Sequence, residues 1–488
     1  MSAQPSLVWF RQDLRIQDNP ALVAAERHGG PVIPAFIWAP EEEGLWAPGA
    51  ASRWWLHQSL TSLEAELRRY GSRLVIRRGP SVAVLTALVR ETGASAVFWN
   101  RRYEPAIVER DTNIQEKLRA AGWIVGTFNA GLLFEAWDVH TKQGNPFKVF
   151  SPFWKACLSL PEPPAPLGAP KKLPLPATWP QTLPLADLEL EPKRDWASGM
   201  RAAWSPGTRG AAVQLERFLE KALPRYVEAR DRPALEGTSR LSPHLHFGEI
   251  SPRQIWHAVR GRRQPGRQGG MAHGQDAYLR QLGWREFAHY LLYHFPHTTD
   301  HPLRPEFANF PWREDTDSLR AWQRGRTGYP LVDAGMRELW STGWMHNRVR
   351  MIVASFLVKH LLLPWQAGAR WFWDTLVDAD LANNSLGWQW VAGCGADAAP
   401  YFRIFHPVRQ GEKCDSNGEY VRRWVPELRK LDVPWIHKPW EASPAALTAA
   451  GVELGRTYPK PVVEHTFARQ RALAALAVMK KRTKRITP

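Results

Sequence analysis

The sequence predicts two kinds of structure in one chain, an α/β domain at the N-terminus and a large all-α domain after it. In residues 6–130, short apolar runs alternate with helical patterns, which is typical of a parallel sheet covered by helices. From about residue 206, apolar residues recur at helical spacing. Between these regions, residues 160–195 are rich in proline and carry no pattern, as expected of a connector. A chain of 488 residues is too long for one compact core, so we expect two or three domains.

The strands of the sheet are expected where apolar runs are short and bounded by turn residues. These runs are Ser6–Phe10, Val32–Trp38, Leu74–Arg77 and Ala96–Trp99, and helical patterns at Ser52–Tyr70 and Ser81–Thr92 lie between them. No GxGxxG motif follows the first strand, so the usual dinucleotide fingerprint is missing. A ligand could still bind at the carboxyl ends of the strands.

The second half of the chain predicts helices throughout. The clearest are Gln275–His294, Ser318–Arg324, Leu331–Trp340 and His346–Leu363. We divide the chain into an α/β domain (1–130), a connector (131–205), a helical domain (206–465) and a basic tail (466–488). Residues Met479–Pro488 of this tail are expected to be a solvated, frayed end.

Composition narrows the class of protein. The formal net charge of +17 favours a polyanionic partner, with nucleic acid first, although charge that only keeps the protein soluble is the alternative. No apolar run is long enough to span a bilayer, and Met1–Phe10 has no signal-peptide pattern. The scattered Cys157, Cys394 and Cys414 predict neither a disulfide framework nor a metal cluster, so we expect a cytoplasmic protein. The 26 Trp residues indicate bulky cores, stacking platforms or electron transfer to a redox cofactor.

The segment Asp378–Trp390, DADLANNSLGWQW, is the first candidate site. It combines two acids, an Asn pair and two Trp in a mostly uncharged window. Buried carboxylates and amides need partners, so this mixture suits a polar ligand with ring nitrogens and hydroxyls. A helix end with capping Asp and Asn residues and two core Trp is the alternative.

The segment Gly237–Pro252, GTSRLSPHLHFGEISP, is the second candidate. Its hydroxyl side chains surround a turn beside Arg240, and Gly237 allows close approach of the backbone, which together predict a phosphate cradle without a P-loop. His244 and His246 do not have the spacing of a common metal site, and we expect them to be structural.

These segments, together with LGWREF (282–287), GYPLVDAGMREL (328–339) and GWMHNRVRM (343–351), resemble the photolyase/cryptochrome family. VWFRQDLRIQDNPAL (8–22) resembles the family's N-terminus, and the likeness runs in order over nearly the whole chain. It implies a Rossmann-like parallel sheet domain joined by a long connector to a large helical FAD-binding domain, with FAD in a U-shaped pose. The residues implied to hold FAD are Tyr226, Thr238, Ser239, Arg240, Leu241, Ser242, Arg285, Trp344, Asn347, Arg350, Asp378, Asp380 and Asn384.

The resemblance also implies a path for electrons. Trp388, Trp365 and Trp312 match the family's Trp relay, with Trp388 nearest the flavin and Trp312 nearest solvent. Asn384 matches the position that faces flavin N5, where photolyases carry Asn, plant cryptochromes Asp and animal cryptochromes Cys. A neutral amide there should favour the fully reduced anionic flavin.

The partner implied is UV-damaged DNA. The residues matched to lesion binding are Arg230, Trp284, Arg348, Met351, Trp390 and Arg403. The arginines would contact phosphates of the lesion strand, and Trp284 and Trp390 would form the walls of a pocket for a flipped dinucleotide.

Gln281 departs from the family's pattern, because photolyases that repair cyclobutane pyrimidine dimers (CPD) usually have Glu there. Gln can donate a hydrogen bond but cannot carry a proton. The (6-4) photolyases do have Gln, yet they need two His where this chain has Asn347 and Met351. We therefore expect light-driven CPD repair with altered efficiency. A cryptochrome-like photoreceptor is the alternative, and a structural or DNA-binding module without light chemistry is the third hypothesis.

A second, antenna chromophore is also implied, with methenyltetrahydrofolate favoured. Asn100–Pro105, NRRYEP, lies where the family binds it, and Glu104 is the candidate contact, with a satisfied loop carboxylate as the alternative. We expect the protein to act as a monomer.

Overall fold

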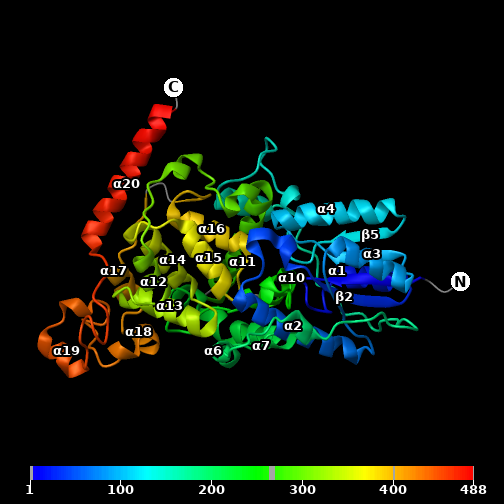
Figure 1. The fold of residues 1–488 in the computed structure, drawn as a ribbon, viewed down its shortest axis with the longest axis horizontal. Coiled ribbons are helices and arrows are strands. Elements are labelled where there is room, and N and C mark those ends of the chain that lie inside the picture. The colour runs from blue at the N-terminus through cyan, green and yellow to red at the C-terminus, as the bar shows by residue number, and fades with distance from the viewer. Residues whose placement is uncertain (1–3, 263–269, 399–401, 487–488) are drawn as a thin grey trace. The chain divides into compact units, whose positions relative to one another are not determined.

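The computed structural model describes residues 4–262, 270–398 and 402–486. It divides into two compact units that interleave along the chain (Figure 1). The first unit comprises Met1–Pro224, Ser239–Pro296 and Val377–Asp380, and the second comprises Arg225–Thr238, His297–Leu376 and Leu381–Pro488. The domain boundaries predicted at residues 130, 205 and 465 remain predictions.

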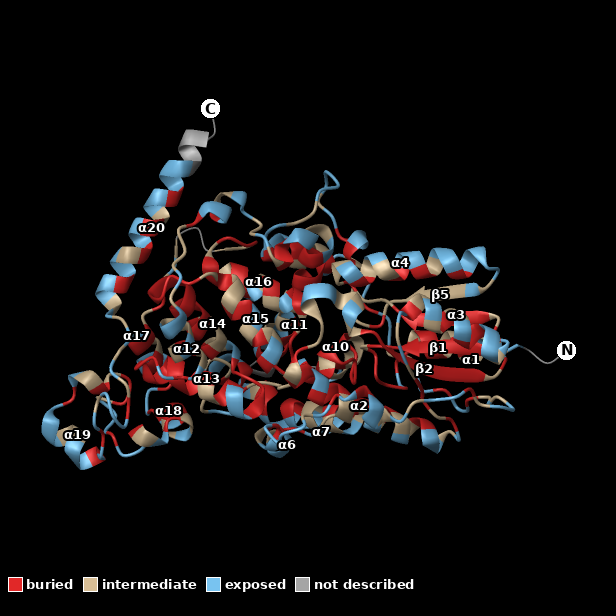
Figure 2. Ribbon diagram, in the orientation of Figure 1, coloured by how far each residue is buried: buried red, intermediate tan, exposed pale blue. Residues whose placement is uncertain are grey.

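A five-stranded parallel sheet forms the centre of the first unit, in the order β3-β2-β1-β4-β5. The strands are β1 (Ser6–Phe10), β2 (Val32–Trp38), β3 (Val75–Arg78), β4 (Ala96–Asn100) and β5 (Ile124–Phe128). Ser6 of β1 is aligned with Val32 of β2 and with Ala96 of β4. Every residue of these three strands is buried, and the β1 and β2 labels in Figure 2 lie on red ribbon. Buried strands on both sides of β1 confirm the predicted α/β part of the fold.

The sequence prediction missed β5. This strand lies at the edge of the sheet, its residues are exposed or half-buried, and it contains Gly126 and Thr127. It therefore lacks the uniform apolar run that marks a central strand. Gly126 is required by packing, because a Cβ there would come within 2.7 Å of the Phe98 ring.

Aromatic and aliphatic side chains of the central strands build the core of the sheet. Trp9 and Trp99 project from neighbouring strands, with ring centroids 5.7 Å apart in an edge-to-face arrangement. Leu7, Ile33 and Val97 are buried beside them. Each such side chain contributes about 1.5–3 kcal/mol by leaving water.

The proline-rich connector covers one edge of the sheet. The Leu183 amide donates to the Ile76 carbonyl of β3 at 3.0 Å, and the Ile76 amide donates to Thr182 Oγ1 at 2.9 Å. An exposed edge strand is a template for unwanted pairing, and the connector occupies these positions.

Arg15 ties three separate segments of the first unit together. Its guanidinium donates to the backbone carbonyls of Asp18, Ala130 and Gly248 at 2.8–3.1 Å. Burial lowers the pKa of Arg15 to about 10, although the nearby Asp18 carboxylate opposes this shift. A charge-assisted donor of this kind links the loop after β1 to residues that follow more than a hundred positions later.

Helices surround the sheet and complete the first unit. Their bounds are α1 (Pro20–His28), α2 (Ala50–Arg69), α3 (Ser81–Thr92), α4 (Pro105–Ala120), α5 (Phe150–Cys157), α6 (Ser198–Ala203), α7 (Thr208–Arg217), the π-helical turn η4 (Phe218–Ala222), α9 (Ser242–His246), α10 (Pro252–Gly261) and α11 (Gly270–His294). The 3-10 turns η1 (Pro40–Trp46), η2 (Ala136–Asp138) and η3 (Leu185–Leu188) lie between them.

The second unit is helical in the described residues. Its helices are α8 (Tyr226–Ala229), α12 (Thr316–Gln323), α13 (Pro330–Thr342), α14 (Asn347–Ser355), the π-helical turn η8 (Phe356–His360), α15 (Trp365–Thr375), α16 (Leu381–Ala392), α17 (Pro407–Cys414), α18 (Glu419–Trp424), α19 (Pro444–Ala450) and α20 (His465–Ile486). Each helix predicted after residue 270 is present, and the prediction for residues 346–363 corresponds to α14 followed by η8. The all-α part of the predicted fold class is thereby confirmed.

The expectation of a frayed C-terminal end is wrong as far as Ile486, because α20 extends to that residue. Ala468, Ala472, Ala475 and Met479 are buried, and this spacing of three or four residues defines one face of a helix. The small alanine side chains gave this face a weak hydrophobic signal in the sequence. Among the described residues, no helix is long and apolar enough to cross a bilayer.

Candidate functional site

Ser239 and Arg240 of the predicted phosphate cradle form a turn just before α9 in the first unit. Arg240 has a φ of 52°, in the left-handed region that residues with a Cβ rarely adopt. Its guanidinium carbon lies 4.4 Å from the centroid of the Trp204 ring, within the range of a cation–π contact. Gln214 Nε2 donates to the Ser239 carbonyl at 2.8 Å. Contacts from two other helical segments therefore hold the turn. Along this segment, Leu241 is buried, Thr238 and Ser239 are half-buried, and Ser242 is exposed.

Two imidazoles surround Asp380. His289 Nε2 lies 3.3 Å from Asp380 Oδ2, and His246 Nδ1 lies 3.8 Å from the same oxygen. Burial alone would raise the pKa of Asp380, but the two histidines outweigh it and hold this pKa well below its usual value. Asp380 is therefore a carboxylate held in place inside the protein. Asp380 itself is half-buried, and Asp378, two residues earlier, is buried.

Arg285 and Glu286 follow one another on α11. Arg285 Nη1 donates to the Gly131 carbonyl at 2.6 Å. Glu286 Oε2 accepts from the amides of Leu133 and Phe134 at 2.8 and 3.2 Å, and burial raises the pKa of Glu286 to about 7. Among the described residues, Glu286 Oε1 has no hydrogen-bond partner although it is buried. Arg285 Nη1 lies 3.6 Å from this oxygen, an ion pair beyond hydrogen-bond distance, so Oε1 can still accept a hydrogen bond from a ligand.

Gln281, Trp284 and Arg285 occupy positions i, i+3 and i+4 of α11, so they share one face of the helix. Trp284 stacks on Phe150, with ring centroids 3.9 Å apart and an interplanar angle of 8°. Gln281 Nε2 donates to the Ala277 carbonyl at 3.2 Å. The helix therefore presents an amide, a fixed aromatic ring and a guanidinium side by side.

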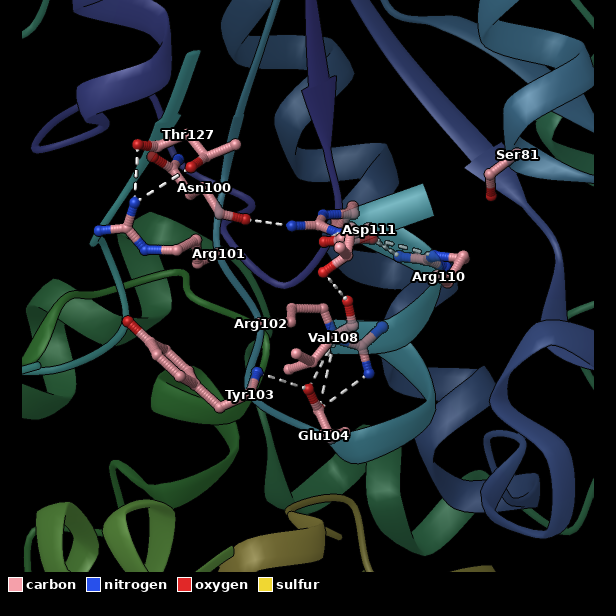
Figure 3. A network of polar contacts seen from close by, with 12 residues as sticks. Ser81, Asn100, Arg101, Arg102, Tyr103, Glu104, Val108, Arg110, Asp111 and Thr127 are labelled. Carbon is pink, nitrogen blue, oxygen red and sulfur yellow. Dashed lines mark hydrogen bonds and ion pairs between the residues drawn. The ribbon is translucent and has the colours of Figure 1, made fainter. Parts of the chain in front are cut away.

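A network of ion pairs occupies the carboxyl ends of β1 and β4 (Figure 3). Arg11 donates to the Asn100 carbonyl and pairs with Asp111. Asn100 Nδ2 donates in turn to Asp13 and to Asn19. In a sheet of this order, β1 and β4 flank the point where strand order reverses, which is the usual ligand position. In this chain, the side chains of Arg11 and Asn100 are bonded to other residues at this position.

Glu104 belongs to the same network. Figure 3 shows nitrogens of Arg102 and Tyr103 converging on its carboxylate, and Arg102 Nη2 lies 2.9 Å from Oε1. Burial would raise the pKa of Glu104, but the Arg102 charge lowers it to about 2. Arg102 also pairs with Glu43 at 2.9 Å. The carboxylate proposed as an antenna contact thus has partners within the protein.

In the second unit, Trp388 of α16 packs against α15. A Cβ at Gly368 would lie 2.6 Å from Trp388 Cζ2 and closer still to Cη2, so the indole lies directly on this glycine. Trp365 is the first residue of α15 and precedes Gly368 by three, so both lie on the same side of that helix. Trp388 and Trp365 are each 2% exposed. Both buried indoles therefore lie on the side of α15 that carries Gly368.

Trp312, the third predicted relay residue, is half-buried. The Arg313 amide donates to the Leu362 carbonyl at 2.8 Å, which joins the segment after Trp312 to the residues just before Trp365. Phe310 contacts the Trp312 ring, with centroids 4.3 Å apart. The three predicted relay residues thus lie on segments that are joined in the order 388, 365, 312.

The other predicted residues of the second unit differ in burial. Tyr226 is buried, burial raises its pKa to about 12, and the Arg230 guanidinium lies 5.4 Å from its ring centroid. Asn384 Nδ2 donates to the Ala369 carbonyl at 3.1 Å. Arg348 Nη2 pairs with Asp231 at 2.8 Å. Trp344 is buried, Arg350, Met351 and Trp390 are half-buried, and Asn347 and Arg403 are exposed.

Four residues that contact the predicted site were missed. His246 and His289 hold Asp380, Glu286 adjoins Arg285, and Trp322 contacts Trp388 with ring centroids 6.2 Å apart. His289 lies four residues after Arg285, one helical turn along α11, which was the available signal. His244 pairs with the buried Glu249, which also accepts from Trp55 Nε1 at 2.9 Å.

Comparison with known families gives two matches within the chain. Residues 6–171 match the family described as DNA photolyase, and residues 278–478 match the FAD binding domain of DNA photolyase.

Individual relatives span the chain. It is 50% identical over 484 residues to a deoxyribodipyrimidine photo-lyase of Agrobacterium fabrum, covering 99% of this chain and 100% of the relative. It is 46% identical to cryptochrome-1 of Arabidopsis thaliana, over 97% of this chain and 70% of that protein. The crystal structure of a class III photolyase from Agrobacterium tumefaciens superposes with a TM-score of 0.94 at 50% identity, covering 99% and 98% of the two chains. The chain therefore belongs to the photolyase/cryptochrome family.

Proposed function

We propose that this protein is a light-driven, FAD-dependent photolyase that repairs cyclobutane pyrimidine dimers in DNA. The observation that carries the proposal is the placement of three indoles in the second unit: Trp388 of α16 lies on Gly368 of α15, Trp365 begins that helix, and the segment after Trp312 is bonded to the residues just before Trp365. Packing alone does not require three indoles on connected segments whose exposure is greatest at Trp312. The name of the A. fabrum relative supports the same chemistry.

The residues present fit FAD. The Arg240 turn is fixed before a ligand arrives, Asp380 is held as a carboxylate, and Glu286 Oε1 is a buried oxygen without a hydrogen-bond partner in the described residues. The residues proposed to hold FAD are Tyr226, Thr238, Ser239, Arg240, Leu241, Ser242, Arg285, Trp344, Asn347, Arg350, Asp378, Asp380 and Asn384. When bound, FAD supplies light absorption and the electron for repair.

The protein's own part in the reaction is to bind, orient and exclude water. The phosphate contacts are proposed for Arg230, Arg348 and Arg403. Trp284, fixed by its stack on Phe150, offers a flat wall to a flipped dinucleotide, and Trp390 and Met351 are proposed beside it. A rigid wall lowers the cost of ordering when the lesion enters.

Gln281 is proposed to contact the lesion base. Its amide donates to the Ala277 carbonyl, one turn earlier on α11. An amide can exchange this intrahelical partner for a base carbonyl, but it cannot carry or share a proton. We infer that repair occurs with altered efficiency compared with a chain that has Glu there.

A cryptochrome-like photoreceptor without efficient repair is the second candidate. Gln281 and the 46% identity to a plant cryptochrome favour it. A (6-4) photolyase is less favoured, because Asn347 and Met351 stand where that chemistry needs two histidines.

One experiment separates these functions. The protein with reduced flavin is illuminated with an oligonucleotide that contains a thymine dimer, and recovery of thymine absorbance is followed. Recovery above a dark control supports repair of the dimer. Bound flavin without recovery, on this substrate or on a (6-4) photoproduct, would support the photoreceptor.

We also propose a second chromophore, methenyltetrahydrofolate, and action as a monomer. Because Glu104 is paired with Arg102, the folate would need other contacts in the first unit or would have to displace that ion pair. Mass spectrometry of the extracted chromophores and sedimentation of the protein test these two proposals.

A further inference from the structure

His289 is placed between two acceptors. Its Nδ1 lies 3.0 Å from the Arg285 carbonyl, and its Nε2 lies 3.3 Å from Asp380 Oδ2. A backbone carbonyl accepts and cannot donate, and Asp380 is a carboxylate, so both ring nitrogens must carry hydrogen to satisfy both contacts. An imidazole with two N–H groups is a cation. With Asp380 ionised, these two contacts describe an ion pair between His289 and Asp380.

The groups around this pair come from three segments of the first unit. Arg285 and Glu286 lie on α11 itself, Tyr103 and Glu104 follow β4, and His246 lies on α9. The Tyr103 ring meets the His289 ring edge to face, with centroids 6.4 Å apart, and Tyr103 Oη donates to Glu135 at 2.9 Å.

Asp380 outweighs the opposing influences on His289. Burial and the Arg285 charge lower the pKa of His289, but the Asp380 carboxylate raises it further, so the net shift is upward from 6.5. The pair is thus neutral overall in its protonated form and carries one negative charge after His289 loses its proton.

We propose that His289 is the positioning residue that holds Asp380, and that the proton on its Nε2 sets the charge presented to the flavin. This inference rests on the proposed function, because the family resemblance places Asp380 at the flavin. If His289 Nε2 lost its proton, the negative charge of Asp380 would no longer be neutralised beside the cofactor. Two hydrogen-bond acceptors, Nε2 and Asp380 Oδ2, would then face each other. Reduction of the flavin to its anionic form adds negative charge, which should raise the pKa of His289 still further.

The proton balance of that linkage is simple. An external reductant such as dithionite supplies two electrons, and the flavin ring takes one proton from water. If the pH lies between the pKa values of His289 in the oxidised and reduced protein, both above 6.5, a second proton goes to Nε2. Each such proton changes the reduction equilibrium tenfold per pH unit, which is 29.6 mV for a two-electron couple.

The test is the reduction potential of the flavin in the FAD-loaded protein, measured from pH 6 to pH 10. The native protein should show a two-proton slope in a window above pH 6.5 and a one-proton slope below it. His289→Arg keeps a permanent cation and a donor to Asp380, so it should bind FAD and show a one-proton slope throughout. His289→Gln keeps the donor without charge, so its potential should be lower than native at pH 6.5.

His294→Gln is the matched control, because His294 lies on the same helix and contacts the Ala136 carbonyl instead. It should keep the native slope. If the reduction potential of the native protein changes with pH at the same slope as that of His289→Arg at every pH, the inference is overturned and the proposed function still stands. A native protein that binds no flavin overturns both. If His289→Gln does not fold, the comparison of native protein with His289→Arg decides the question.

Discussion

Trp388 lies on Gly368 so closely that any side chain at residue 368 would overlap the indole. Gly368→Ala should therefore displace the ring or strain α15, and overpacking of this kind costs roughly 1–3 kcal/mol. Chemical denaturation should show the loss of stability, and flavin photoreduction should slow. Gly387→Ala on α16 is the matched control, since a Cβ there meets nothing within 4 Å, and it should raise helix stability by about 0.5–1 kcal/mol.

Trp388→Phe should nearly abolish steady photoreduction of bound FAD in the presence of an external reductant. The ring and its packing are largely kept, whereas the easily oxidised indole is lost. Trp322→Phe is the control, because Trp322 contacts Trp388 but donates its Nε1 to the Val353 carbonyl and is outside the proposed relay. Equal losses in both variants would mean that packing, and not electron transfer through Trp388, controls the reaction.

Binding of DNA should weaken steeply with salt. Each of Arg230, Arg348 and Arg403 replaced by Ala should reduce the slope of log affinity against log salt by roughly 0.7–0.9, if each neutralises one phosphate. Arg68→Ala, on the exposed face of α2 and paired with Glu64, should leave the slope unchanged. A native affinity for lesion DNA that is constant from low to high salt would contradict the proposed phosphate contacts.

Gln281→Glu should raise repair per absorbed photon on a dimer substrate without changing flavin content. The carboxyl group can share a proton with the lesion base, which the amide cannot. The exchange also removes the donor to the Ala277 carbonyl, so unfolding free energy should fall slightly. Gln281→Leu, which offers no hydrogen bond, should repair less than native. A yield in Gln281→Glu at or below native would show that the pocket is adapted to the amide.

Acid should destabilise the second unit through the buried His360 and the half-buried His465. His360 Nε2 and His465 Nδ1 lie 2.9 Å apart, burial lowers the pKa of His360 to about 3, and burial lowers that of His465 to about 4. Because the folded protein binds protons less readily than the unfolded chain, stability is full above pH 6.5 and falls as pH drops towards 4. Urea denaturation between pH 7.5 and pH 5 should show a smaller loss in His465→Gln than in the native protein. Parallel curves would mean that other groups cause the acid sensitivity.

The parts of the fold that the sequence predicted are those with a strong local signal. β1 and β2 have the predicted bounds because each is a run of buried apolar residues, and α3 has them because its apolar spacing ends at Gly93. β5 and the alanine face of α20 were missed because their packing depends on neighbours that are distant in sequence.

The candidate site was predictable in part for the same reason. The acids, the amide and the indoles stand in recognisable segments, so their identity could be predicted. The partners of Asp380 could not, because His246 and His289 lie more than ninety residues before it, and the one local signal, the position of His289 one turn after Arg285, does not point to Asp380. A pairing of this kind is a property of the tertiary structure.

The hydrogen bonds from Arg15 to three backbone carbonyls affect how the chain folds during synthesis and how it resists proteolysis. One of them belongs to Gly248, and the same unit also includes Val377–Asp380. A ribosome must therefore complete most of the polypeptide before the N-terminal sheet has all its partners. We expect a fragment that ends near residue 130 to expose the buried guanidinium and to be cleared by proteases, whereas the intact chain withstands them.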